Sequence, residues 1–198
     1  AVSAAPLFAQ SIEPAGARED FDVLWKSIRE AHGALNRHVA PAELDRRVAA
    51  YRSRLDKPMP TVAFVGLLQE SVSELRDGHM RMEPDSAAAA AFSSALLIPL
   101  RFAFEEGRLI VAYNDSPSDS TIRPGMSIVS INGVTADELV RQLLRTIPGD
   151  GFIETGKRFI VARQFAVLYW RFVGPAESYS VVARDQNGRQ VSATLRGI

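Results

Sequence analysis

The sequence predicts an α+β protein, because helical hydrophobic patterns fill its first part and alternating patterns fill much of its second part. The change of period falls in "ELRDGHMRM", residues 74–82, where a helical stripe stops at an Asp-Gly pair. Near the C-terminus, Asn187-Gly188 separates two apolar alternating runs, a strong hairpin signal. With 198 residues, the chain can bury the core of one ordinary domain or of two small ones.

The first part is expected to contain three helices, over residues 18–35, 41–58 and 60–78. Each carries an apolar stripe at three- and four-residue steps and cannot bury this stripe alone, and the connections are short, which favours a small antiparallel bundle. We expect Gly78 to end the third helix, since glycine readily takes the backbone conformation needed there. The stripes are Phe21, Leu24, Ile28 and Ala31, then Leu44, Val48, Tyr51 and Leu55, then Val65, Leu68, Val72 and Leu75.

The second part is expected to begin after a run of small residues near 85–94. Residues 96–114 predict a hairpin, with two apolar runs around Glu-Glu-Gly. A strand, an Asn-Gly turn and a helix follow, and Thr135 lies three residues before Glu138, the spacing of a capping box. Residues 154–173 predict a longer helix, whose Tyr169 and Trp170 are assigned to the core.

Composition excludes several functional classes. Lys plus Arg and Asp plus Glu number 23 each, so the zero net charge argues against a nucleic-acid partner. No apolar run reaches the length of about 18 residues that a membrane span requires. The absence of cysteine excludes disulfides, Cys-rich zinc sites and thiol nucleophiles. We expect no metal or cofactor, because His32 and His38 have no evident third ligand and the "GDG" turn at 149–151 is too short for a phosphate loop.

The first ten residues, "AVSAAPLFAQ", have the small and apolar residues found at the end of a secretory signal. We therefore expect residues 1–18 to be disordered or a signal-peptide remnant, and the protein to be exported to the periplasm or the extracellular space. The alternative is an ordinary flexible N-terminus.

Several motifs together resemble one protein family. "IRPGMSIVSINGVTADELVRQLL" resembles the central stretch of a bacterial PDZ domain, although Met126 replaces the usual Asp. With "DFDVLW", "EAHGAL", "DGH" and "IPGDGFIETGKRF", the chain is similar to the N-terminal half of the tail-specific and tricorn-core family of serine peptidases. The resemblance covers about residues 19–195. It implies a helical domain over 19–85 and, over 95–198, a PDZ-like, partly open β-barrel with an inserted long helix.

The resemblance also implies a role for His79. In the tricorn-core branch, the histidine after the third helix is the general base that activates a serine from a later domain, and His79 matches it. An unperturbed imidazole can accept a hydroxyl proton near neutral pH. The processing branch uses a Ser-Lys pair instead, so His79 could also be a helix-terminal histidine bonded to nearby backbone. Asp77 either orients His79 or accepts hydrogen bonds at the helix end or in the loop.

A PDZ domain binds a peptide by adding it as a strand to its sheet. The resemblance therefore implies a peptide groove between the first strand of the second part and the helix that follows the Asn-Gly turn. The alternative is that the inserted helix blocks this surface, which then serves only packing. The implied substrate-binding residues are Ile98, Leu100, Phe102, Leu139 and Leu143.

Two functional hypotheses remain. The first is the N-terminal part of an exported serine-type peptidase, whose partners are a peptide or protein substrate and a C-terminal catalytic domain outside this chain. Because no Gly-x-Ser-x-Gly elbow is present, this chain alone is expected to be inactive. The second is a non-catalytic peptide-binding or scaffold module built from the same parts.

Overall fold

A computed structural model describes residues 11–83 and 95–198, which divide into two compact units. The described residues 11–83 and 146–153 belong to the first unit, and 95–145 and 154–198 belong to the second. Helices dominate the first unit and antiparallel strands the second, so the predicted α+β class is confirmed. The expected boundary at 85–94 lies outside the described residues.

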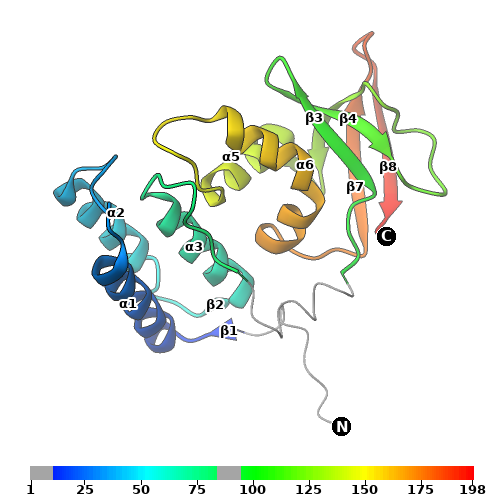
Figure 1. The fold of residues 1–198 in the computed structure, drawn as a ribbon. Helices are drawn as coiled ribbons and strands as arrows, with labels where there is room; N and C mark the ends of the chain where they lie inside the picture. The colour runs from blue at the N-terminus through cyan, green and yellow to red at the C-terminus, as the bar shows by residue number, and fades with distance from the viewer. Residues whose placement is uncertain (1–10, 84–94) are drawn as a thin grey trace. The chain divides into compact units, whose positions relative to one another are not determined.

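Three helices build the first unit: α1 (Pro14–Ala31), α2 (Pro41–Ser53) and α3 (Thr61–Ser73), as Figure 1 shows. The short strands β1 (Ser11–Ile12) and β2 (Met59–Pro60) pair antiparallel. The described residues of this unit begin at Ser11 in β1. The helices bury a shared apolar cluster that includes Trp25, outside the predicted stripe, and its indole N–H donates to Ser71 Oγ at 3.2 Å.

The end of α3 differs from the expectation. The chain leaves the helix through a tight turn in which Glu74 N–H and Leu75 N–H donate to carbonyls three residues back. Arg76 then takes the left-handed conformation, with φ of 55°, whereas Gly78 has no positive φ. The prediction that Gly78 ends the helix was wrong, because Arg76 supplies the left-handed residue.

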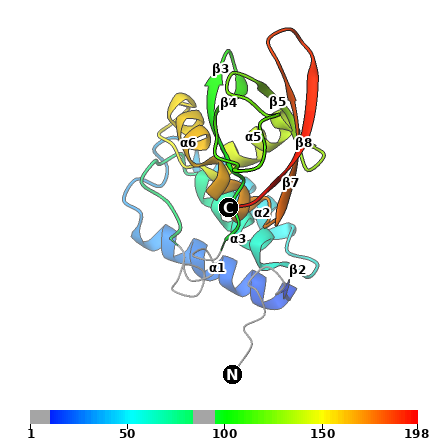
Figure 2. The same ribbon diagram turned by 90° about the vertical axis from the view of Figure 1, so that its right-hand side faces the viewer.

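The second unit contains an antiparallel sheet in the order β3-β4-β5-β7-β8 (Figure 2). The short strand β6 pairs with β5. In the turn between β3 and β4, Glu106 and Gly107 have φ of 50° and 79°. Asn132 and Gly133 repeat these values between β5 and β6, as the Asn-Gly motif predicts for a turn with two positive φ angles. The strands are β3 (Leu100–Glu105), β4 (Arg108–Asn114), β5 (Ser127–Ile131), β6 (Val134–Thr135), β7 (Ser178–Arg184) and β8 (Gln190–Arg196).

Helices α5 (Ala136–Thr146) and α6 (Thr155–Phe172) complete this unit. The hydroxyl of Thr135 accepts the Glu138 N–H at 3.3 Å, as the capping-box spacing predicts. Helix α6 packs beside β3 (Figure 2). In this contact the rings of Phe102 and Phe165 lie 4.6 Å apart. Tyr169 is buried as expected, whereas Phe159 near the start of α6 is 60% exposed. In the described ranges, no helix is both long and apolar enough to cross a membrane.

Candidate functional site around His79

The segment after α3 holds His79 through a short hydrogen-bonded turn. The Asp77 carboxylate accepts the backbone N–H of His79 at 2.8 Å, and the same oxygen lies 3.2 Å from the ring atom Nδ1 of His79. Asp side chains commonly accept a backbone N–H two residues further on. Here this local turn also brings the carboxylate to the imidazole, so Asp77 both accepts loop hydrogen bonds and orients His79.

A second histidine holds Asp77 from the other side. His32 Nε2 lies 3.1 Å from the second carboxylate oxygen of Asp77, and His32 Nδ1 accepts the backbone N–H of Ala34 at 3.2 Å. Because Nδ1 accepts, Nε2 carries the proton of a neutral His32 and donates it to Asp77. Both ring nitrogens of His32 are thus engaged within the protein.

These contacts favour the charged form of Asp77. The backbone hydrogen bond from His79 is the largest influence and lowers the pKa of Asp77. Partial burial acts in the opposite direction, and the ring hydrogen bonds of His79 and His32 add to the lowering. Asp77 is therefore a carboxylate at neutral pH, the form that accepts an N–H from an imidazole.

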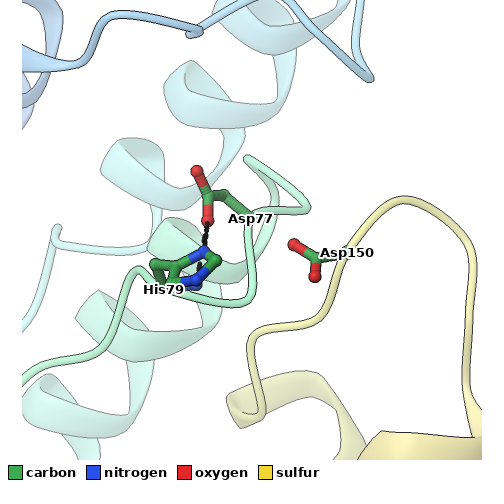
Figure 3. Close-up of side chains that lie close together, drawn as sticks. All are labelled: Asp77, His79 and Asp150. Atoms are coloured by element: carbon green, nitrogen blue, oxygen red, sulfur yellow. Dashed lines mark hydrogen bonds and ion pairs between the residues drawn. The ribbon is translucent and has the colours of Figure 1, made fainter.

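Asp150 is the third group of the cluster. It lies between α5 and α6 in the sequence, and its side chain points towards the segment that carries Asp77 and His79 (Figure 3). The Asp150 carboxylate accepts the backbone N–H of Gly78 at 2.9 Å. Sequence reasoning identified residues 149–151 only as a turn and missed this side chain, because nothing local indicates that the segment returns to the end of α3.

The cluster has the donor types of a divalent-metal site, since potential ligand atoms of Asp77, His79 and Asp150 lie within 4.8 Å of one another. Both carboxylates, however, already accept hydrogen bonds from the protein, and the His79 and Asp150 side chains are exposed. These hydrogen bonds account for the arrangement, and we assign no metal to it.

His79 presents its ring to the outside of the described structure. Its side chain is 91% exposed, and Nδ1 faces Asp77. Among residues 11–83 and 95–198, no hydrogen bond to Nε2 is found. An imidazole with Nδ1 on a carboxylate and Nε2 accessible is suited to accepting a proton from a hydroxyl group. The cluster thus contains an accessible imidazole and two carboxylates, and it contains no serine hydroxyl.

The predicted peptide-binding residues lie in the interior of the second unit. Phe102 is covered by Phe165 of α6, which agrees with the alternative that the inserted helix occupies this surface. Their role in peptide binding stays a prediction. The exposed fractions are 3% for Ile98, 2% for Leu100, 6% for Phe102, and 0% for Leu139 and Leu143.

An open groove of about 800 Å³ lies between β3 and the first half of α6, and Phe102 is among its lining residues. Arginines stack on aromatic rings in its wall: the guanidinium of Arg101 lies 4.3 Å from the Tyr113 ring centre, and that of Arg158 lies 5.6 Å from the Phe104 ring centre. The only sequence signal for this groove is the helical position of Phe159 away from the buried face.

Comparisons with known proteins find a similar fold among solved structures. No known family model matches the sequence, and no curated protein matches it. Solved structures of CPAF are similar to this chain in fold. The sequence identities below are low, so the likeness shows the fold alone.

The similar CPAF structures differ in their state. Mature CPAF complexed with lactacystin has a TM-score of 0.62 at 14% identity, over 92% of this chain. Mature CPAF has a TM-score of 0.58 at 14% identity over 92% of this chain. A serine-to-alanine mutant of CPAF has a TM-score of 0.55 at 15% identity over 93% of this chain. The chain spans only about a third, 34%, of the length of the CPAF chains that it matches.

Proposed function

We propose that this chain is the N-terminal part of an exported serine-type peptidase, in which His79 is the general base for a serine in a domain outside this chain. The observation that carries the proposal is the geometry of His79, whose Nδ1 lies 3.2 Å from Asp77 and whose side chain is 91% exposed. A base that serves another domain has to present its ring outwards. The fold likeness to about a third of the CPAF chain supports the part of the proposal that makes this chain a piece of a longer peptidase.

The proposed chemistry follows from this geometry. Asp77 holds the proton of His79 on Nδ1, which leaves the lone pair of Nε2 for the serine hydroxyl. As the serine oxygen attacks the scissile carbonyl, its proton moves to Nε2, and the imidazolium then gives this proton to the leaving amine. Water hydrolyses the acyl-enzyme with the same histidine as base. Asp77 stabilises the imidazolium in both steps.

In this proposal the second unit binds the peptide or protein substrate as a PDZ-like module. The β3 strand lies at one edge of the sheet, where an extended peptide can add as a further strand. The groove beside β3 offers the exposed aromatic residues Tyr113 and Phe159 to apolar side chains.

The same groove favours a second candidate, a non-catalytic peptide-binding module. An exposed aromatic groove beside an edge strand can bind a peptide without any chemistry. The two candidates differ in whether a nucleophilic serine is encoded beyond Ile198 and whether it depends on His79.

The test uses a fluorophosphonate probe, which reacts with activated serines. The product of the complete reading frame and the 198-residue chain are treated in parallel. We expect labelling of the complete product only, and a labelling rate about a hundredfold or more lower in His79→Gln, the scale expected for loss of a general base. Labelling of the chain alone, a reading frame without a labelled serine, or equal labelling of His79→Gln would contradict the proposal.

A further inference from the structure

The sequence motifs "DGH" and "GDG" form the two halves of one contact within the first unit. The Gly151 N–H donates to the carbonyl of Arg76 at 2.9 Å, and the guanidinium of Arg76 donates back to the Gly151 carbonyl at 3.3 Å. The same guanidinium lies 4.1 Å from the ring centre of Phe152. The Gly78 N–H donates to Asp150 at 2.9 Å. Residues 150–152 are therefore attached to residues 76–78 by reciprocal contacts.

This contact explains the glycine at position 78, and Gly151 is favoured by its backbone conformation. A Cβ atom on Gly78 would lie 3.2 Å from an Asp150 carboxylate oxygen, closer than most real Cβ contacts. Gly151 has φ of +59°, and a Cβ atom there would lie 3.5 Å from the ring of His38. A side chain at position 78 would displace the carboxylate, so the bare backbone of glycine permits the hydrogen bond.

His79 depends on its backbone for its position. Its side chain is 91% exposed, so few packing contacts hold the ring. The ring is held by Asp77 on one side, and the peptide unit between Asp77 and Gly78 is held by Asp150 through the Gly78 N–H. Without the hydrogen bond from Gly78 to Asp150, the turn that carries His79 loses one of its contacts, and the direction of the imidazole is less defined.

We infer that Asp150 is a positioning residue, which fixes the backbone at Gly78 and thereby the direction of the His79 imidazole. This inference rests on the proposed function for its catalytic meaning, but the positioning itself can be measured without any reaction. Asp150 acts on the backbone before His79, so the acceptor oxygen matters more than the negative charge. Asp150→Asn keeps an acceptor at this position, and Asp150→Ala removes it.

The test is carried out by NMR on the 198-residue chain. The observables are the amide hydrogen exchange of Gly78 and the three-bond couplings from the His79 backbone to Cγ, which report the χ1 rotamer. In Asp150→Ala, we expect Gly78 exchange to accelerate about tenfold or more, as loss of a hydrogen bond to a charged group implies, and the couplings to show rotamer averaging. Asp150→Asn should retain most of the protection and one dominant rotamer. Asp56→Ala, an exposed aspartate in the same unit, serves as the control.

A second variant covers the case in which Asp150→Ala unfolds. Gly78→Ala leaves Asp150 in place but crowds it, and is expected to reproduce the faster exchange at residue 78 and the averaging at His79. Its matched control is Gly33→Ala, where an added Cβ meets nothing within 4 Å. Wild-type exchange and couplings in a folded Asp150→Ala or Gly78→Ala chain would overturn the inference. An active His79→Gln enzyme would instead overturn the proposed function and leave the positioning result standing.

Discussion

Arg76 is the residue that turns the chain from α3 towards His79. A non-glycine residue in the left-handed conformation costs roughly 1–2 kcal/mol, and Arg76 has φ of 55°. Its carbonyl accepts the Gly151 N–H and its guanidinium lies against the Phe152 ring, so the contact with residues 150–152 offsets this cost. Arg76, the left-handed residue that follows α3, thus also holds residues 150–152 beside the segment that carries His79.

The stability of this turn should depend on pH through Asp77. Its pKa is lowered in the folded state, so its contribution is fully present above the ordinary value of 3.8 and is lost as the pH falls through the lower folded-state pKa. We expect Asp77→Asn to have a lower free energy of unfolding than wild type at pH 7. The difference should shrink as both proteins are acidified below the ordinary value.

Urea unfolding at a series of pH values measures this difference. Asp56→Asn, which changes an exposed aspartate of the same unit, is the control and should follow wild type throughout. A constant difference between Asp77→Asn and wild type from pH 7 down to the acid limit would show that the carboxylate charge is not what stabilises the turn.

Single residues were predictable where their signal is local. His79 was identified because the Asp-Gly-His segment after a helical stripe matches a motif of the family that the sequence resembles. Asp150 was missed because its partner, Gly78, lies 72 positions away in the sequence. The hydrogen bond between His32 and Asp77 spans 45 positions and was missed for the same reason.

At the scale of elements, α6 is anchored to the sheet by an aromatic row. Phe165 contacts Phe102 of β3 at 4.6 Å between ring centres, and Tyr169 continues the row to Tyr179 of β7 at 5.6 Å. The Tyr179 hydroxyl donates to the Leu96 carbonyl at 2.9 Å. Burial raises the pKa of Tyr179 to about 12, so this hydroxyl remains a donor at neutral pH.

Truncating this row should destabilise the second unit strongly. Phe165 is only 1% exposed, and Phe165→Ala is expected to lower the free energy of unfolding by about 3–5 kcal/mol, the usual cost of removing a buried phenylalanine ring. Phe159→Ala on the same helix removes a ring that is 60% exposed. This substitution should change the free energy of unfolding by no more than about 0.5 kcal/mol. Denaturant unfolding of both variants measures the contrast, and similar losses would mean that α6 is not held by its Phe165 face.

The elements themselves followed from short-range patterns. The Asn-Gly and Glu-Gly turns, the Thr135 cap and the range of α6 were visible in the sequence, because each depends on neighbouring residues. The packing of α6 beside β3 was left open between an accessible and a blocked surface, since periodicity identifies a buried face but not its partner.

At the scale of the whole molecule, the two units divide the chain in a way that composition alone could not predict. Residues 146–153 belong to the first unit although they follow α5 of the second. The fold class was predictable from the change of hydrophobic period, whereas the complete activity was not. The chain spans 34% of the CPAF chains that it matches, and the proposed nucleophile lies outside it.

The central claim is that His79 is the general base of a serine-type peptidase, and turnover of the complete protein tests it most directly. We expect His79→Ala to lower kcat by about two to four orders of magnitude, the range for loss of a general base. Its melting temperature should stay close to that of wild type, because the side chain is 91% exposed and exposed substitutions change stability by about 0.5 kcal/mol or less. A folded His79→Ala protein with wild-type kcat would contradict the account and leave His79 as a structural residue at the end of α3.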